Sequence, residues 1–463
     1  GYGDSPYQSC SAFAGNPYFI DLDALKAEGL LTAAQLKAEE WGENPLEVDY
    51  GTLYTSRYKV LRTAYQAWRE QCAGQHGCAF YYPDDYYAFT LANEAWLEDY
   101  ALYMALKTEH QMKSWTDWPR EYRTRDAGAL ARFRAAHEEE IGFWKFLQYK
   151  FDTQWKAVKD YANAKGVKIL GDIPIYVSAD SVDAWVGGPL FELDGEGRFA
   201  RVAGCPPDGF SADGQLWGNP LYRWDYHRET GYQWWISRLA HCFRLYDVVR
   251  IDHFRGFDAY YAIPASAETA KEGTWEAGPG LDFFRAVEKV VGQRPIIAED
   301  LGFLTPSVHQ LLKNTGYPGM KVLEFAFDSR DGGGRTYQPH NYPTNCVAYV
   351  GTHDNDTALG WISTASPEDV ALAREYLHLD SIEGENWGMM RAIWSSTADY
   401  AIVQMQDLLG LSSEGRINTP STLGGNWQWR ALPGFDSPAL AKRLLRQMKL
   451  YERLPQERKG EKS

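Results

Sequence analysis

The stretch Val248-Val249-Arg250-Ile251-Asp252-His253-Phe254 decides which fold this chain is expected to adopt. Two β-branched residues open it and a polar cluster closes it, a pattern that indicates a buried strand with a functional end. Side chains alternate along a strand, so Arg250 and Asp252 point to the same side. A guanidinium beside a carboxylate favours the ionised carboxylate that a nucleophile needs. For this pair alone, a purely structural ion pair is an equally good interpretation.

Three further apolar runs end in acidic residues in the same way. They are Val167–Ile175 with Asp172, Arg294–Gly302 with Glu299, and Asn345–Thr357 with Asp354. In a (β/α)8 barrel, the carboxyl ends of all strands face a single active-site rim. We therefore expect an α/β fold of the TIM-barrel type, with these carboxylates gathered at one rim.

Composition argues against several classes of partner. The 463 residues are 44% hydrophobic, enough for a large core, and the net charge is −15. That charge argues against nucleic acid or an anionic membrane as a partner. No apolar run approaches the length of about 18 residues that a membrane span requires. Aromatic residues make up 15% of the chain, and their rings suit platforms for sugar faces, although core packing explains most of them.

The six cysteines are scattered and predict reduced thiols in a cytoplasmic protein. Cys72, His76 and Cys78 could supply three zinc ligands, but no fourth ligand lies nearby in the sequence. A small disulfide loop between Cys72 and Cys78 is a second alternative. We expect loop residues there, and neither a metal nor a cofactor.

We expect one catalytic barrel domain over residues 1–463 with two insertions. Residues 21–150 carry apolar residues at helical spacing and are predicted to form an inserted, mostly helical subdomain. Residues 178–230 are rich in Gly, Pro, Asp and Trp with little periodicity. They are expected to form a loop subdomain over the active site.

From residue 248 onward, strand patterns alternate with helix patterns, which is typical of a parallel sheet with covering helices. Thr305-Pro306 and Ser366-Pro367 each predict a helix start, with a capping side chain before Pro at the first helical position. Further strands are expected at Met320–Phe327 and Ala401–Leu409. Counted from the Asp172 run, six barrel strands are expected rather than eight.

Several segments resemble a known family. Gly171-Asp172, Arg250–Gly256, Ala298–Gly302 and Gly351–Thr357 resemble the four signature regions of the α-amylase superfamily. Six further stretches are similar to the 4-α-glucanotransferases, also called amylomaltases or disproportionating enzymes. They are Gly1–Gln8, Ser11–Pro17, Pro206–Asp208, Gln215–Pro220, Arg416–Pro420 and Asn426–Arg430. The resemblance runs from Gly1 to about Glu452, nearly the whole chain.

The resemblance implies a cofactor-free, retaining transfer of α-1,4-glucan segments to a glucan or glucose acceptor. Asp252 would be the nucleophile, Glu299 the general acid and base, and Asp354 a contact to sugar hydroxyls that helps distort the ring. Retaining chemistry places the first two carboxyl groups about 5–5.5 Å apart. The residues themselves agree with these roles. Arg250 favours a charged Asp252, and the apolar approach Ile296–Ala298 favours a protonated Glu299. The neighbouring Asp300 faces the opposite side of that strand and is expected to be structural.

Further residues match family segments around the donor and acceptor sites. The expected substrate contacts are Arg250, His353, Asp172, Ser5, Tyr7, Asp208, Phe210, Trp217, Asn418 and Pro420. Gly209 stands where relatives usually carry an aromatic residue, so we expect a weaker acceptor site and some hydrolysis beside transfer. Relatives also carry a segment before Gly1–Gln8 that holds the first two barrel strands, so these strands are expected to be missing here.

Three functions remain open at this point. A transferase would move glucan segments between chains, and a hydrolase of the same superfamily would release sugars to water. A glucan-binding protein without activity would result if the missing strands inactivate the barrel. The helical block and the segments Pro206–Pro220 and Arg416–Pro420 favour transfer, because the familiar hydrolases lack them. The presence of all three acids argues against the inactive binder.

Overall fold

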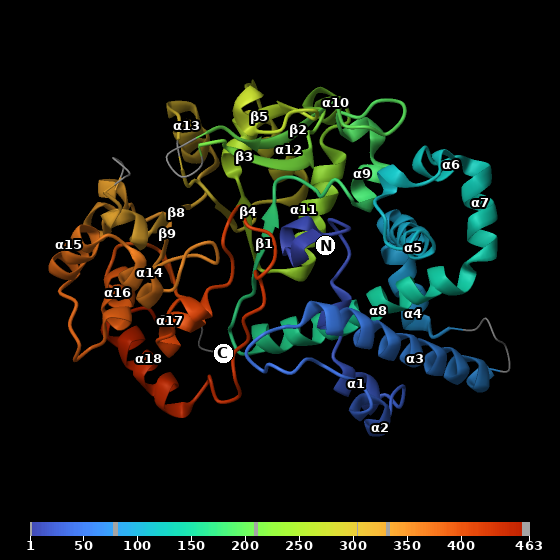
Figure 1. Cartoon of the computed structure of the whole chain (residues 1–463), viewed down its shortest axis with the longest axis horizontal. Coiled ribbons are helices and arrows are strands. Elements are labelled where there is room, and N and C mark those ends of the chain that lie inside the picture. The colour runs from blue at the N-terminus through green and yellow to red at the C-terminus, as the bar shows by residue number, and fades with distance from the viewer. Residues whose placement is uncertain (1, 77–81, 208–211, 303, 330–333, 456–463) are drawn as a thin grey trace, which may run out of the picture. The chain divides into compact units, whose positions relative to one another are not determined.

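The computed structural model describes residues 2–76, 82–207, 212–302, 304–329 and 334–455 (Figure 1). The chain forms two compact units, and each is described by itself. The first unit comprises Gly1–Glu43, Asp49–Ile296 and Leu304–Thr315. The second comprises Asn44–Val48, Ile297–Phe303 and Gly316–Ser463.

The first unit contains a helical block in the region predicted to be helical. Its helices are α1 (Leu22–Ala27), α2 (Ala33–Lys37), α3 (Tyr50–His76), α4 (Asp84–Ala92), α5 (Glu94–Glu109), α6 (Arg120–Arg123), α7 (Ala127–Ala136) and α8 (Glu138–Ala164). Helices α3, α4 and α5 pack on α8 (Figure 1). Their shared core is rich in aromatic rings, such as Trp68, Tyr103 and Phe146. The aromatic residues of this region therefore serve mainly in core packing, as expected from the composition for most of the aromatic residues.

Two parallel strands of the first unit position the first group of predicted site residues. Strand β1 (Leu170–Pro174) pairs in parallel with β4 (Val248–Asp252), so that Asp172 lies opposite Arg250 and Pro174 opposite Asp252. Helix α11 (Gln233–Leu245) precedes β4, and α12 (Gly280–Val291) follows it further along the chain. The predicted apolar runs are strands, and their acidic residues lie at or near the carboxyl ends.

Residues 178–230 differ from the expected loop subdomain because they contain regular elements. These are α9 (Val182–Val186), β2 (Arg201–Cys205), β3 (Gln215–Pro220) and α10 (Trp224–Glu229). Strands β2 and β3 join β5 (Ala259–Pro264) and β6 (Thr274–Ala277) in an antiparallel sheet of order β3-β2-β5-β6. The partner strand β5 lies far along the chain, so no local pattern announces the pairing.

The second unit contains a parallel sheet of order β10-β9-β8, formed by β8 (Gly319–Val322), β9 (Cys346–Tyr349) and β10 (Tyr400–Ile402). Its helices are α14 (Ala358–Thr364), α15 (Pro367–Leu377), α16 (Glu385–Trp394), α17 (Met405–Leu409) and α18 (Pro438–Leu450). The predicted strands Met320–Phe327 and Ala401–Leu409 are too long. Each strand stops early and is followed by a helix, the 3₁₀ helix η8 (Leu323–Phe327) in the first case and α17 in the second.

Helix starts follow the capping signals in the sequence. In the first unit, α13 (Pro306–Thr315) begins at the Pro after Thr305 and is followed by Gly316 with a φ of 71°. In the second unit, the side chain of Ser366 accepts a hydrogen bond from the backbone of Asp369 at the start of α15. Both predicted helix starts are confirmed.

Candidate active site

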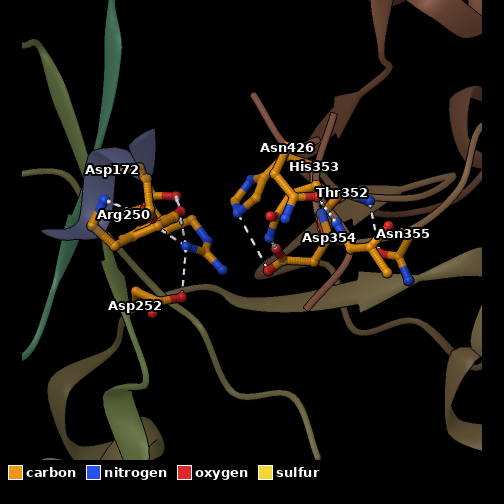
Figure 2. Close-up of polar contacts among 12 residues, drawn as sticks. Asp172, Arg250, Asp252, Thr352, His353, Asp354, Asn355 and Asn426 are labelled. Atoms are coloured by element: carbon orange, nitrogen blue, oxygen red, sulfur yellow. Dashed lines mark hydrogen bonds and ion pairs between the residues drawn. The ribbon is translucent and has the colours of Figure 1, made fainter. Parts of the chain in front are cut away.

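The guanidinium of Arg250 joins two carboxylates, Asp172 within β1 and Asp252 at the end of β4 (Figure 2). Its Nη1 lies 2.7 Å from both Oδ1 and Oδ2 of Asp172 and 3.0 Å from Oδ1 of Asp252. The cross-strand pairing of Asp172 with Arg250 and the alternation along β4 together produce this arrangement. The structure thus brings three of the predicted site residues into one cluster.

Burial differs sharply within this cluster. The Arg250 side chain is only 6% exposed, whereas that of Asp252 is 32% exposed. A buried guanidinium favours the ionised form of the carboxylates that it contacts. The cluster therefore presents a negatively charged Asp252 oxygen pair at the accessible end of the strand, as a nucleophile requires.

The N-terminal segment adds a hydroxyl donor to the same cluster. The side chain of Ser5 accepts a hydrogen bond from the backbone of Tyr7 and caps the 3₁₀ helix η2 (Pro6–Gln8). The hydroxyl of Tyr7 donates to Oδ2 of Asp172 at 2.7 Å. Burial, together with the charges of Asp172 and Asp252, raises the pKa of Tyr7, so the phenol keeps its proton and donates. Ser5 thus orients Tyr7, and Tyr7 supports Asp172.

Trp217 lies on β3 and contacts the residue that follows Asp252. Its ring meets the ring of His253 edge-on, with centroids 4.8 Å apart, and lies 6.3 Å from the ring of Tyr176. His253 adopts a left-handed backbone conformation with a φ of 55°. Desolvation, followed by the charge of Arg255, lowers the pKa of His253 to about 3, so this ring is neutral. Sequence reasoning singled out Trp217 but missed Tyr176 and the role of His253 as its neighbour.

In the second unit, Asp354 is the centre of another polar cluster (Figure 2). It lies in the loop after β9, where Nδ2 of Asn418 donates to its Oδ1 at 2.7 Å and Nε2 of His353 lies 3.3 Å from its Oδ2. The hydroxyl of Thr352 accepts a hydrogen bond from the backbone N–H of Asp354. Three predicted site residues, His353, Asp354 and Asn418, are therefore brought together by this unit.

A segment distant in sequence holds the Asp354 loop from one side. Arg416 donates from Nη2 to the backbone carbonyl of Asp354 and from Nε to that of Asn418, each at 2.9 Å. The backbone N–H of Asn418 donates to the carbonyl of His353 at 3.1 Å. The ring of Trp427 lies 5.3 Å from that of His353. Arg416 and Trp427 were not predicted as site residues, although both lie within the stretches that carry the family resemblance.

Glu299 and Asp300 follow β7 (Ile296–Ala298), within which the division between the two units falls. The backbone N–H of Leu301 donates to Oε1 of Glu299 at 2.8 Å, and the side chain of Glu299 is partly exposed. Asp300 is buried and accepts a hydrogen bond from the backbone N–H of Met320 in β8. The structural role expected for Asp300 is confirmed.

Of the other predicted contacts, two lie outside the described residues and one lies on the surface. Asp208 and Phe210, with Gly209, lie outside the described residues. Pro420 is exposed, two residues beyond Asn418. Cys78 also lies outside the described residues, whereas Cys72 is a free, buried thiol in the core of the helical block.

Carboxyl groups that follow the strands of a mixed α/β fold are typical of enzymes that act on glycosidic bonds. The model of the 4-alpha-glucanotransferase family matches residues 2–434, and the chain belongs to that family. It is a glycosyltransferase of the hexosyltransferase type and transfers segments of α-1,4-glucan.

Individual relatives agree with this assignment. The 4-alpha-glucanotransferase of Clostridium butyricum is 45% identical over 98% of this chain and 91% of its own length. That of Thermus thermophilus is 46% identical over 98% of this chain and 90% of its own. A solved structure, amylomaltase from Streptococcus agalactiae in complex with acarbose, matches with a TM-score of 0.92 at 38% identity. It covers 98% of this chain and 90% of that one, so the fold resembles that of amylomaltase.

Within the described part of the chain, no helix combines the length and the apolar character that crossing a bilayer would require.

Proposed function

We propose that this chain performs the family's glucan transfer with Asp252 as the nucleophile, Glu299 as the general acid and base, and Asp354 as a contact to the distorted sugar ring. The observation that carries the proposal is the contact of Arg250 Nη1 with Asp252 and Asp172 on paired parallel strands. A carboxylate held charged in this way is suited to attack an anomeric carbon.

The proposed reaction has two displacement steps. In the first, an Asp252 oxygen bonds to the anomeric carbon, the glycosidic C–O bond breaks, and Glu299 gives its proton to the leaving oxygen. In the second, an acceptor sugar hydroxyl attacks the same carbon, its proton passes to Glu299, and the carboxylate of Asp252 leaves. Two inversions retain the α configuration, which requires carboxyl groups about 5–5.5 Å apart when glucan is bound.

Asp354 has a different proposed task. Its Oδ1 accepts a hydrogen bond from Asn418 and its Oδ2 lies near Nε2 of His353, so the directions of both oxygens are fixed before a sugar arrives. Hydrogen bonds from such oxygens to sugar hydroxyls can strengthen as the ring flattens toward the transition state. His353 and Asn418 would share those sugar contacts.

The remaining predicted contacts are proposed to border the donor and acceptor sites. They are Arg250, Asp172, Ser5, Tyr7, Asp208, Phe210, Trp217 and Pro420. Of these, Trp217 offers a partly exposed ring on β3 that suits stacking on a sugar face. Gly209 is proposed to weaken acceptor binding and so to permit some hydrolysis.

We also propose the finer architecture expected from the sequence. Residues 1–463 would act as one catalytic (β/α)8 domain, with residues 21–150 as a helical subdomain and 178–230 as a subdomain over the site. A cytoplasmic location stays a prediction, as does the lack of nucleic-acid and membrane partners, for which the net charge of −15 is the support.

Incubation with maltotriose, with products resolved by chain length, tests the proposed function. An acceptor competes with water only when it is bound and oriented, which can be worth an effective molarity of about 10⁵ M or more. We expect glucose plus a ladder of longer maltooligosaccharides, while the number of reducing ends stays nearly constant. A steady rise in reducing ends without longer products would identify a hydrolase. Binding of glucan with no change in chain length would identify an inactive binder.

A further inference from the structure

Three carboxyl groups of the second unit lie around the base of the Asp354 loop and have no part in the proposed reaction. They are Glu324 in η8, Asp356 in the loop itself, and Asp407 in α17. Glu324 is influenced electrostatically by both of the others, and Asp407 by Asp356. Three acids that interact in this way call for a physical reason, because burying like charges together is costly.

Glu324 packs directly against the start of the loop. Its side chain is buried, with the whole residue 3% exposed. A Cβ atom placed on Gly351 would come within 2.7 Å of Oε1 of Glu324 and within 3.0 Å of the Cβ of Asn355. The carboxyl group of Glu324 therefore occupies the space that a side chain at position 351 would take. Within the described residues, Oε1 of Glu324 is buried without a hydrogen-bond partner.

The two other acids are anchored differently. Asp407 is fully buried, and its Oδ1 accepts a hydrogen bond from the backbone of Ala358 at 2.7 Å, at the start of α14. Its Oδ2 is buried without a partner in the described part of the chain. Asp356 accepts from the hydroxyl of Ser413 at 2.7 Å and from the backbone of Thr357 at 2.8 Å. Glu324 is thus the acid with the weakest support for a negative charge.

The charged groups that face Glu324 are Asp407 from α17, Asp356 from the loop and Arg416 from the segment after α17. Arg416 donates its hydrogen bonds to the backbone carbonyls of Asp354 and Asn418 rather than to Glu324. Burial, then Asp407 and Asp356, raises the pKa of Glu324 well above its usual range, and Arg416 offsets only part of this. Burial raises the pKa of Asp407 to about 6.

We propose that Glu324 is a positioning residue for Asp354: its carboxyl group stays protonated, fills the space beside Gly351, and fixes the start of the loop that carries Asp354. The inference rests on the proposed role of Asp354. Ionisation of Glu324 would place a further negative charge beside Asp356 and Asp407, and the repulsion would displace the loop that carries Asp354. A neutral carboxyl group fills the space beside Gly351 without that repulsion.

The protonation state can be measured without reference to activity. In the infrared difference spectrum of wild type minus Glu324→Gln at pH 7, we expect the C=O stretch of one protonated carboxyl group. Absence of that band would overturn the proposal.

The protonation of Glu324 also predicts how the stability of the fold depends on pH. A raised carboxyl pKa stabilises the fold fully below the unfolded pKa of about 4.3, and this contribution is lost as pH rises through the folded-state pKa. The folding constant of wild type relative to Glu324→Gln should therefore fall about tenfold per pH unit across that window. A flat ratio would contradict the proposal.

The positioning role is measured by kcat and KM for maltotriose. Glu324→Gln keeps the shape and a neutral group, so its kcat at pH 7 should stay within about threefold of wild type. Glu324→Ala vacates the space beside Gly351, and Glu324→Asp withdraws the carboxyl group from it. Both should lower kcat by about tenfold to a hundredfold with little change in KM, since small displacements of a catalytic group have effects of that size. Glu324→Asp supplies the result if Glu324→Ala fails to fold.

Ile393→Ala is the matched control, because Ile393 is a fully buried residue of α16 in the same unit. It should lower stability but leave the kcat of the folded enzyme near the wild-type value. Wild-type kcat in both Glu324→Ala and Glu324→Asp, or a kcat loss equal to that of the control, would overturn the positioning role. Absence of transfer by wild type, or full activity of Asp354→Asn, would instead refute the proposed function, and the infrared band would still decide the state of Glu324.

Discussion

The two polar clusters hold their aspartates by different means. In the first unit, Asp252 belongs to a strand and is held by the charge of Arg250. In the second, Asp354 belongs to a loop and is held by the side-chain amide of Asn418 and by the backbone contacts of Arg416. One arrangement fixes a charge, and the other fixes the directions of two oxygens.

This difference matches the tasks proposed for the two residues. A nucleophile must be ionised and aligned, and a strand end with a buried guanidinium supplies both. A group that binds a distorted sugar needs oriented hydrogen bonds that tighten in the transition state. The hydrogen bond from Asn418, a residue of a distant segment, to the Asp354 loop provides that orientation without a second buried cation. The comparison predicts that substitutions in the two clusters differ in size and kind.

Asp252→Asn should have the largest effect. An amide has no nucleophilic oxygen comparable with a carboxylate, so turnover of maltotriose should fall by at least about 10⁴-fold. The side chain keeps its shape, so the melting temperature should change by only a few degrees. Residual turnover within about a hundredfold of wild type, in a sample free of wild-type enzyme, would mean that Asp252 is not the nucleophile.

Arg250→Lys should have the next largest effect. One guanidinium nitrogen contacts both Asp172 and Asp252, and a shorter ammonium group cannot reproduce this geometry. We expect kcat to fall about a hundredfold with a small change in KM. Tyr7→Phe serves as the control, because it removes a single hydroxyl donor to Asp172 and should cost tenfold or less, in line with about 0.5–1.5 kcal/mol per hydrogen bond. Equal losses in the two variants would show that the shared contact of the Arg250 guanidinium with Asp172 and Asp252 is not what matters.

Asn418→Ala tests the loop cluster and should be milder. It removes the donor to Oδ1 of Asp354 but leaves the contacts of Arg416 in place. A kcat loss of about tenfold is expected, since a hydrogen bond to a charged group contributes about 1.5–3 kcal/mol and the sugar itself supplies donors when bound. Asn345→Ala removes an exposed amide contact to Gly316 in the same unit and should leave kcat unchanged. An unaltered kcat in Asn418→Ala would show that the loop orients Asp354 unaided.

The smallest expected effect is on the pH dependence of stability, which has opposite directions for a buried histidine of the first unit and a buried aspartate of the second. Burial lowers the pKa of His227 in the first unit to about 4, so the fold loses stability as pH falls below the unfolded value of about 6.5. His227→Gln lacks this loss, so its free energy of unfolding should rise relative to wild type by about 1.4 kcal/mol for each pH unit that pH falls between those values.

In the second unit, the raised pKa of Asp407 means that stability is lost as pH rises through about 6. Asp407→Asn should therefore become more stable relative to wild type as pH rises. Urea midpoints at pH 5 and pH 7.5 measure both trends. Parallel trends in the two variants would contradict the assigned protonation states.

Strand-borne features were predictable from the sequence because their signals are local. The run from Val248 to Asp252 showed both its burial and the side shared by Arg250 and Asp252. The capped helix starts at Thr305-Pro306 and Ser366-Pro367 were equally local.

Features that depend on distant partners were not predictable from local pattern. The strands β2 and β3 pair with β5, and nothing within residues 178–230 announces that pairing. The donation from Arg416 to the Asp354 backbone joins residues more than sixty positions apart. From the sequence, Glu324 was predicted to lie in a long strand, whereas it lies in η8. Its carboxyl group is buried beside Gly351 through tertiary packing, which no local pattern indicates.

The covalent intermediate on Asp252 is the central claim, and mass spectrometry tests it most directly. Glu299→Gln incubated with an α-maltosyl fluoride should complete the first step, since fluoride leaves without an acid, and should stall before the second, since no base remains. Acid quenching, pepsin digestion and peptide sequencing should then locate one glycosyl unit on the side chain of Asp252. A glycosyl adduct on any other residue, or release of fluoride with no adduct at all, would contradict the account.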